Sequence, residues 1–221
     1  NCLNSVFDQS YKNLEVIIID DCSTDKTRST ICKLIEHYND QRFKLLNLDS
    51  NVGVSTARNI GIRNSSGELI YFLDSDDDIL PDCIEDLVTA YIDTGADIVI
   101  AENYFIESSK KNTVQISLPE GYYKGGKVVE SFCRRLWNNQ VWNKLIKKEL
   151  ITRNNIFFAE GLTLEDELFS LQIALNANAL YVLKKPTYNY YIRQGSIIRT
   201  AGRNLGRWLT FSSINRLMSD Y

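Results

Sequence analysis

Leu-Ile-Tyr-Phe-Leu-Asp-Ser-Asp-Asp-Asp, residues 69–78, is an apolar run that ends in four carboxylates within five positions. A short apolar run bounded by polar residues is typical of a buried strand. Carboxylates crowded this closely repel one another unless a cation compensates them, and oxygen ligands suit Mg²⁺ or Mn²⁺ better than zinc. We therefore predict a divalent metal and phosphate site where this strand ends. The alternative is a solvated acidic loop in which Asp78 or Asp82 lies near a helix N-terminus.

A second acidic loop follows the apolar run 14–19, whose last four residues are β-branched, as in a strand buried on both faces. The loop reads Asp20-Asp21-Cys22-Ser23-Thr24-Asp25. A carboxylate at the end of a strand can accept a hydrogen bond from a ribose hydroxyl or a base N–H. Alternatively, Ser23, Thr24 or Asp25 caps the helix that follows.

The first hundred residues alternate between strand and helix patterns. Predicted strands at 14–19, 43–48, 69–73 and 97–101 are separated by helical periodicity near 31–38, 55–63 and 84–91. This order predicts an α/β fold with a parallel sheet, helices on its faces and a ligand site at the carboxyl ends of its strands. Pro81 is expected at the first position of the third helix and Gly95 at its C-cap.

Beyond residue 102 the pattern becomes mixed. We expect a hairpin of 104–107 and 114–118 around a polar loop at 108–112, helices near 127–137, 147–154 and 163–177, and short strands at 181–183 and 187–192. The segment 204–221 is amphipathic and predicts an appended helix. No repeat or linker interrupts the chain, so one compact domain is the simplest organisation.

Two further groups carry charge that chemistry can use. Arg58, within Ala57-Arg58-Asn59-x-Gly61, can pair with a diphosphate or a base edge, or it can form a surface ion pair with the acidic loops. The second group is the pair Glu165 and Asp166. The alternative role is helix capping, because Thr163 and Asp166 have the spacing of a capping box. A capping role and a functional role are compatible, because a carboxylate at a helix N-terminus is held rigidly.

Composition excludes several other classes. The net charge of −3 gives no reason to expect nucleic-acid binding, and no apolar run reaches the roughly 18 residues of a membrane span. The five cysteines are scattered and the only histidine is His37, so we expect free thiols, as in a reducing cytoplasm, rather than a disulfide scaffold, a zinc site or a histidine-based triad. Dinucleotide-binding and P-loop glycine motifs are absent.

Taken together, these strings resemble family 2 inverting glycosyltransferases with the GT-A fold. The resemblance covers roughly residues 1–199, and the order and spacing of the strings are more specific than any one of them. The matching pieces are Gln9-Ser10-Tyr11-Lys12-Asn13-Leu14-Glu15, Ile19 to Asp25, Asn51-x-Gly53, Ala57-Arg58-Asn59-x-Gly61, Gly67-Glu68, Phe72 to Asp77, Trp142-Asn143-Lys144-Leu145, Glu165-Asp166-x-x-Phe169, Tyr190-Tyr191-x-Arg193-Gln194 and Ser196-Ile197.

The resemblance implies a GT-A, Rossmann-like, mostly parallel sheet flanked by helices. Residues 1–101 would be the donor-binding half, 102–199 the acceptor and catalytic-base half of the same domain, and 200–221 an amphipathic helical tail. The family begins with an apolar strand and a Pro-x-Tyr-Asn-type turn, so we expect a first strand and turn, on the order of ten to twenty residues, to be missing here. Cys22 stands where the family usually has glycine, and a small side chain should fit there.

The resemblance also implies a role for each matching residue. On the donor side, Asp20 or, preferably, Asp21 would hold the nucleoside with help from Arg58, while Asp74 and Asp76 would hold the diphosphate and a Mg²⁺ or Mn²⁺ ion, Asp76 more directly. On the acceptor side, Asp166 would be the general base. Glu165, Asp77, Trp142 and Lys144 would contribute to the donor or acceptor side.

The function that follows is transfer of a sugar from a nucleoside-diphosphate sugar, expected to be a UDP-sugar, to a hydroxyl of a glycan or lipid-linked acceptor. We expect a cytoplasmic protein. Its tail is expected to pack on the domain, to form a homodimer, or to contact the inner face of the membrane through Trp208, Phe211 and its arginines. Two alternatives stay open: a metal-dependent phosphotransferase or phosphatase with Asp74 as nucleophile, and a non-catalytic nucleotide-sugar-binding subunit.

Overall fold

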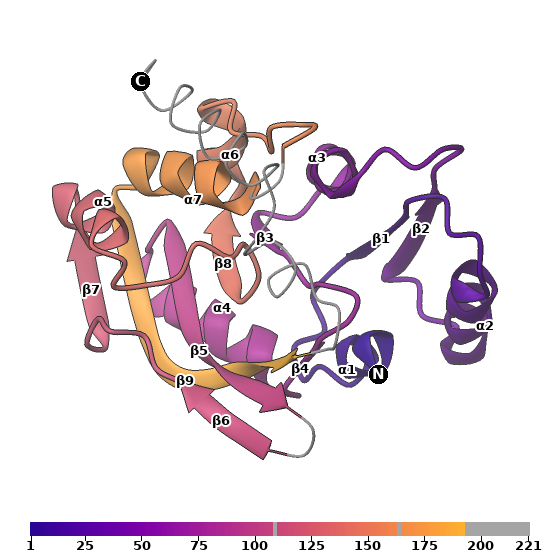
Figure 1. Ribbon diagram of the computed structural model, residues 1–221. Helices are drawn as coiled ribbons and strands as arrows, with labels where there is room; N and C mark the ends of the chain where they lie inside the picture. The colour runs from indigo at the N-terminus through magenta and orange to yellow at the C-terminus, as the bar shows by residue number, and fades with distance from the viewer. Residues whose placement is uncertain (108–109, 163–164, 193–221) are drawn as a thin grey trace.

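The computed structural model describes residues 1–107, 110–162 and 165–192, which form an α/β fold with two sheets (Figure 1). The smaller sheet is a parallel pair, and the larger one is mixed, with the strand order β3-β8-β5-β9-β4, β6 added to β5 and β7 added to β9. The strands are β1 (Val16–Asp20), β2 (Phe43–Asn47), β3 (Leu69–Tyr71), β4 (Asp78–Ile79), β5 (Ile98–Glu107), β6 (Lys110–Val114), β7 (Gly121–Lys124), β8 (Lys144–Lys147) and β9 (Ala179–Tyr191).

Helices cover both faces of the larger sheet, because β5 is apolar on both sides. Ile98 and Ile100 belong to a core shared with α5, α6 and α7, whereas Val99 and Ala101 belong to a core shared with α1 and α4. This alternation is the period of two expected of a strand between two layers. The helices are α1 (Cys2–Phe7), α2 (Thr27–Tyr38), α3 (Val54–Asn64), α4 (Cys83–Thr94), α5 (Gly126–Cys133), α6 (Lys148–Arg153) and α7 (Glu165–Asn176).

The predicted α/β class is confirmed, but the expectation of a mostly parallel sheet is wrong for the described strands. Only β1 with β2 and β5 with β9 run parallel, and the other pairs are antiparallel. The main reason is β8, which enters antiparallel between β3 and β5. Its four residues are too few to show a strand pattern, and an apolar run buried on both faces fits either direction of pairing.

Several boundaries in the second half also differ from expectation. The polar loop predicted at 108–112 is shorter, because Lys110 already pairs with Glu107 and β6 is an exposed edge strand with polar residues. The two predicted strands at 181–183 and 187–192 form the single strand β9, which tolerates Pro186 where its register with β5 shifts. Pro81 lies before the N-cap Asp82, not inside α4, while Gly95 is the left-handed C-cap as predicted. The expected tail helix at 200–221 lies outside the described residues.

Asn143 provides hydrogen-bond partners for backbone carbonyls at the point where the register between β5 and β9 shifts. Its Nδ2 donates to the carbonyls of Ala101 and Glu102 at 2.8 and 2.9 Å, and its Oδ1 accepts from the Thr187 hydroxyl at 2.7 Å. The residue is 3% exposed and has a φ of 57°. Asparagine therefore supplies both the left-handed conformation and the hydrogen bonds that the register shift requires.

We expect Asn143→Ala to lower the free energy of unfolding by about 3 kcal/mol, because two buried carbonyls and a hydroxyl lose their partner. Urea unfolding followed by circular dichroism measures the change. Asn155→Ala is the matched control, since Asn155 has a φ of 51° but is exposed, and it should cost only about 1 kcal/mol. Equal losses in the two variants would show that backbone conformation, and not hydrogen bonding, is what Asn143 provides.

Candidate active site

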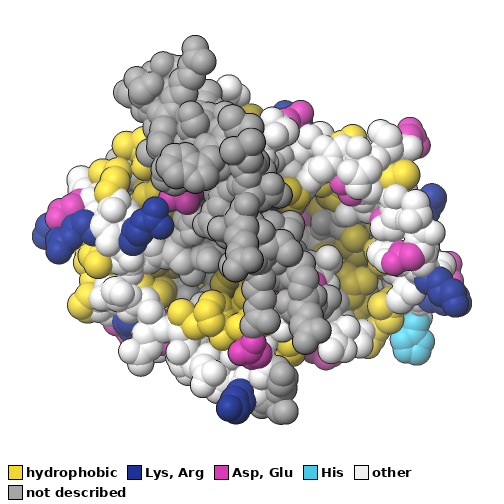
Figure 2. Space-filling view, viewed as in Figure 1, with side chains coloured by type: hydrophobic (Ala, Val, Ile, Leu, Met, Phe, Trp, Pro, Cys, Tyr) yellow, Lys and Arg dark blue, Asp and Glu magenta, His cyan; other side chains and the backbone are white. Residues whose placement is uncertain are grey.

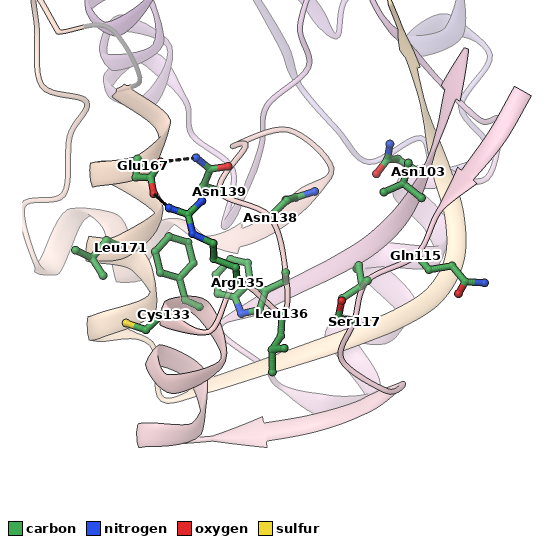
Figure 3. A pocket seen from close by; sticks show the side chains of 14 residues that line it. Asn103, Gln115, Ser117, Cys133, Arg135, Leu136, Asn138, Asn139, Glu167 and Leu171 are labelled. Carbon is green, nitrogen blue, oxygen red and sulfur yellow. Dashed lines mark hydrogen bonds and ion pairs between the residues drawn. The ribbon is translucent and has the colours of Figure 1, made fainter. Parts of the chain in front are cut away.

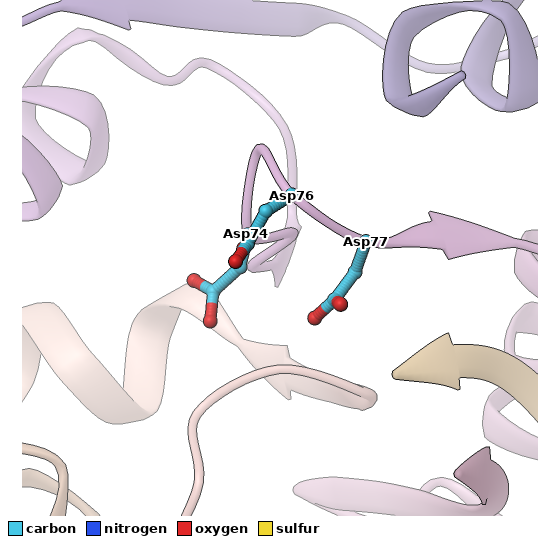
Figure 4. A group of neighbouring side chains, drawn as sticks. All are labelled: Asp74, Asp76 and Asp77. Carbon is cyan, nitrogen blue, oxygen red and sulfur yellow. The ribbon is translucent and has the colours of Figure 1, made fainter. Parts of the chain in front are cut away.

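The acidic loop after β3 brings three carboxylates together (Figure 4). Ligand atoms of Asp74, Asp76 and Asp77 all lie within 4.8 Å of one another. The Asp77 N–H donates to the Asp74 carbonyl at 3.1 Å, so this stretch forms a turn. The crowding predicted from the sequence is therefore present in three dimensions.

Two of the acidic side chains fasten the loop to β9. Asp77 is 2% exposed and accepts hydrogen bonds from the Tyr188 hydroxyl at 2.7 Å and the Tyr191 N–H at 2.9 Å. Asp78 accepts from Asn189 Nδ2 at 2.6 Å and from the Tyr191 hydroxyl at 2.8 Å. Burial raises the pKa of Asp77 to about 6, although the hydrogen bonds that Asp77 accepts from Tyr191 and Tyr188 oppose the rise. Asp77 and Asp78 thus position the loop, which leaves Asp74 and Asp76 as the better candidates to hold an ion.

Arg58 joins this loop to the start of α7. Its Nη2 donates to Asp74 at 3.0 Å, and its Nη1 donates to both Glu165 and Asp166 at 2.8 Å. The Arg58 side chain is only 13% exposed, so these are largely buried ion pairs and not the surface pair considered as an alternative. Predicted donor-side and acceptor-side residues from three separate segments therefore meet at one guanidinium.

Burial sets the protonation behaviour of this cluster. It raises the pKa of Asp166 to about 6, with the Arg58 guanidinium opposing the rise and the Glu165 carboxylate adding to it. It also raises the pKa of Asp74, again against the effect of Arg58. The raised pKa makes Asp166 more basic than an ordinary carboxylate, which suits a group that accepts a proton.

Asn59 fixes the orientation of the Arg58 helix, a role that the sequence did not reveal. Asn59 is 1% exposed; its Nδ2 donates to the Phe158 carbonyl at 3.0 Å, and its Oδ1 accepts from the Phe158 N–H at 2.9 Å. The Phe158 ring lies 5.3 Å from the Arg58 guanidinium and stacks on Phe169 of α7 at 4.0 Å. In the sequence, the only indication of this role was that Asn59 directly follows Arg58 in the motif Ala57-Arg58-Asn59-x-Gly61.

Asp20 and Asp21 lie at the carboxyl end of β1, where their carboxylates hold loops. Asp21 accepts from the Val52 and Gly53 N–H groups at 2.7 and 2.9 Å, and Asp20 accepts from the Ser23 hydroxyl and N–H. Neither residue is among the carboxylates that Arg58 contacts in the described part of the chain, which are Asp74, Glu165 and Asp166. Gly53 is the N-cap of α3, so Asp21 fixes the start of the helix that carries Arg58.

The turn between these carboxylates and α2 explains two features of the sequence. Cys22 has a φ of 61°, a conformation that favours glycine, the residue the resemblance leads one to expect there. Of the three candidate caps, Asp25 makes the contact, because its Oδ1 accepts from the Thr27 N–H at 2.8 Å. Asp25 is nevertheless not the N-cap of α2, which is Lys26 and makes no side-chain cap hydrogen bond, so the capping alternative is only approached by the Asp25 contact.

Trp142 and Lys144 lie beneath the site, not on its surface. Trp142 is 3% exposed and stacks on Tyr188 at 4.5 Å, and Phe72 forms an isolated bridge with it. Lys144 is 2% exposed and donates to Asn138 Oδ1 at 2.5 Å and to the Gln140 carbonyl. Burial lowers the pKa of Lys144 to about 7, while the charge of Asp166 opposes the shift. Both residues can therefore shape the site only indirectly, Trp142 through Tyr188 and Lys144 through the loop that contains Asn138 and Gln140.

Comparison with known proteins identifies the family. A sequence model described as glycosyl transferase family 2 matches residues 1–157. The chain belongs to glycosyltransferase family 2. It is 31% identical over 208 residues to glycosyltransferase GlyA of Streptococcus pneumoniae, and 33% identical over 215 residues to the putative glycosyltransferase EpsH of Bacillus subtilis. These alignments cover 90% and 92% of this chain but only 29% and 60% of the relatives.

A solved structure confirms the GT-A fold. The structure of Staphylococcus aureus TarS 1–349 in complex with UDP-GlcNAc matches with a TM-score of 0.77 and 27% identity, over 90% of this chain and 56% of that chain. The family removes the support for the phosphotransferase alternative.

Two surface properties of the described residues bear on partners. None of the described helices is both long and apolar enough to cross a membrane. Figure 2 shows the described Lys and Arg side chains of this face at separate places, mostly near its margins.

We expect Arg58→Met to lower the free energy of unfolding by about 3 kcal/mol, because three carboxylates stay close together without their cation. Arg134→Met is the matched control: Arg134 pairs with Glu130 at 3.2 Å, but both side chains are largely exposed, so the loss should be about 0.5 kcal/mol or less. Thermal and urea unfolding measure both. A similar small loss in the two variants would mean that the Arg58 cluster is not a stabilising unit.

Proposed function

We propose that this chain is the donor-binding and catalytic part of an inverting glycosyltransferase that moves a sugar from a UDP-sugar to a hydroxyl of a glycan or lipid-linked acceptor. The observation that carries the proposal is the contact of Arg58 with Asp74 on one side and Asp166 on the other. This contact supports the proposal because Asp74, which we assign to the diphosphate and metal, and Asp166, which we assign as the base, share one guanidinium. Family membership and the likeness to TarS bound to UDP-GlcNAc support a nucleotide-sugar donor.

The donor set of the acidic loop fits a divalent cation. It consists only of carboxylate oxygens, which Mg²⁺ and Mn²⁺ prefer. Asp76 and the Asp74 oxygen that does not contact Arg58 would hold the ion, whereas the hydrogen bonds from β9 commit Asp77 to the loop itself. When bound, such an ion neutralises charge on a departing diphosphate.

Asp166 would act on the acceptor. The acceptor hydroxyl gives its proton to the Asp166 carboxylate while the hydroxyl oxygen forms a bond to the anomeric carbon. The bond between that carbon and the diphosphate oxygen breaks, and the diphosphate leaves with the electron pair. Because attack comes from the face opposite the leaving group, the configuration inverts in one displacement and no enzyme nucleophile is needed. Arg58 holds Asp166 in place and, through Asp74, couples its position to the donor side.

Asp20 and Asp21 would hold the nucleoside from the end of β1, with Asp21 the better candidate. In this structure the Asp21 carboxylate already binds the Val52 and Gly53 N–H groups, so it would use remaining lone pairs toward the nucleoside. A non-catalytic nucleotide-sugar-binding subunit is the competing proposal. Slow release of free sugar from UDP-GlcNAc without acceptor separates the two, since only a catalyst accelerates it.

Asp166→Asn should lower the rate of transfer by roughly 10²–10⁴-fold, because the amide cannot accept the proton. The variant keeps the shape of the side chain, so UDP affinity should stay within about twofold. Transfer from UDP-GlcNAc to a glycan array and calorimetric titration with UDP measure the two quantities. Asp93→Asn, an exposed site on α4, is the control with unchanged activity. Near-normal transfer by Asp166→Asn would remove Asp166 from the mechanism.

Asp76→Ala should weaken UDP binding in the presence of Mn²⁺ by at least about tenfold, since the ion loses its more direct ligand. Calorimetry with UDP and Mn²⁺ measures this affinity for wild type and variant. Titration in the presence of a chelator is the control, because the metal-independent affinity of the two proteins should be equal. Unchanged metal-dependent affinity would mean that the acidic loop does not hold the ion.

A further inference from the structure

A cavity of about 430 Å³ opens beside the start of α7 (Figure 3). Its volume is within the range of small-molecule sites. Its walls come from the β5–β6 side, from the end of α5 with the loop that follows it, and from α7. The polar lining residues are Asn103, Gln115, Ser117, Arg135, Asn138, Asn139 and Glu167, and the apolar ones include Phe132, Leu136, Trp137 and Leu171.

The lining chemistry suits an uncharged, hydroxyl-rich ligand. Most of its polar groups are carboxamides and a hydroxyl, which both donate and accept hydrogen bonds. Among the lining residues that the structure describes, the ionic groups are Arg135 and Glu167, which lie 3.4 Å apart, with the Arg135 side chain 76% exposed. A phosphate in this cavity would therefore meet no cation without a carboxylate beside it, whereas sugar hydroxyls would find partners of both kinds.

Two side chains of the cavity are prepared for a ligand in different ways. Glu167 is held by Asn139 Nδ2 at 2.9 Å on one oxygen and by Arg135 on the other, so its direction is fixed (Figure 3). Asn103 is 2% exposed, yet its side-chain hydrogen bond to the Tyr104 carbonyl is 3.5 Å long, which is weak. A buried carboxamide with so poor a bond is uncommon, and a ligand hydroxyl in the cavity would improve it.

Helix α7 contributes both to the cavity wall, through Glu167 and Leu171, and to the candidate base, Asp166. Glu167 directly follows Asp166, and consecutive Cα atoms are about 3.8 Å apart. The Ser170 hydroxyl of α7 donates to the Asn139 carbonyl at 2.6 Å, and buried Lys144 binds Asn138 and the Gln140 carbonyl. The loop 138–140 is thus anchored to β8 and to α7, the helix that carries both Glu167 and Asp166.

We propose that this cavity is the subsite for an uncharged sugar residue of the acceptor glycan, with Glu167 and Asn139 binding its hydroxyls. The inference rests on the proposed function, because it deepens the acceptor side of that site. Glu167 accepts from ligand hydroxyls and Asn139 both donates and accepts. We expect neutral sugars to bind better than polyol phosphates, because most of the polar lining residues are carboxamides and Arg135 lies beside the Glu167 carboxylate.

The test is binding of sugars observed on the protein by NMR, with no donor present. The probes are the methyl glycosides of N-acetylglucosamine, N-acetylgalactosamine, glucose and galactose, with ribitol 5-phosphate as the anionic comparison. We expect at least one glycoside to shift the side-chain amide signals of Asn103, Asn138 and Asn139. Asn139→Ala should weaken that affinity by about 3- to 10-fold, while Asn64→Ala, on exposed α3 surface, should not change it.

Three results would overturn the proposal: no shift of these signals with any glycoside, stronger shifts with ribitol 5-phosphate, or equal effects of the two asparagine variants. A cavity that binds sugars in a protein that neither binds nor hydrolyses UDP-GlcNAc would instead contradict the proposed function. Hydrolysis of UDP-GlcNAc by the wild-type protein without acceptor is the separate readout of the proposed function, and it should be unchanged in the surface variant Asn64→Ala.

Discussion

The site depends on one buried cation, Arg58, that compensates carboxylates from two distant parts of the chain. Asp74 and the pair Glu165 and Asp166 would repel one another at these distances without it. Because the guanidinium is planar and its donors have fixed directions, it holds the acidic loop and the start of α7 in one relative orientation. The placement of α3 is therefore a condition for the site, and Asp21 and Asn59 act as parts of the site by fixing that helix.

The larger sheet explains why the acidic loop lies where it does. β3 and β4 are at opposite ends of the strand order β3-β8-β5-β9-β4, so the loop between them must pass over the ends of the intervening strands. β9 is strongly curved in Figure 1, and β4 pairs with its C-terminal part. The hydrogen bonds of Asp77 and Asp78 with β9 secure the far end of the loop, and Asp74 and Asp76 are thereby presented near α7.

The sequence allowed prediction of those parts whose physical signal is local. β-branched and apolar runs located β1, β2, β3 and β5, and helical periodicity located α2, α3 and α4. The acidic strings and their resemblance to a family located the carboxylates. Strand direction and the short strands β4, β7 and β8 could not be predicted, because they are defined by their partners. Asn59 and Asn143 read as ordinary polar residues, since the carbonyls they bind are 99 and about 42 positions away.

The two sides of the site are specified in different ways, which bears on how such proteins differ from one another. The donor side uses carboxylates that follow strands directly, so chemistry and fold are encoded in the same few residues. The cavity on the acceptor side uses carboxamides from a loop after α5, and that loop is held through backbone carbonyls of Asn139 and Gln140. Carbonyl contacts do not depend on side-chain identity. Asn139 can therefore change without loss of these backbone contacts, whereas Asn138 also accepts from Lys144 through its side chain. Under the proposed function, the acceptor contact of Asn139 is thus separable from the position of the loop.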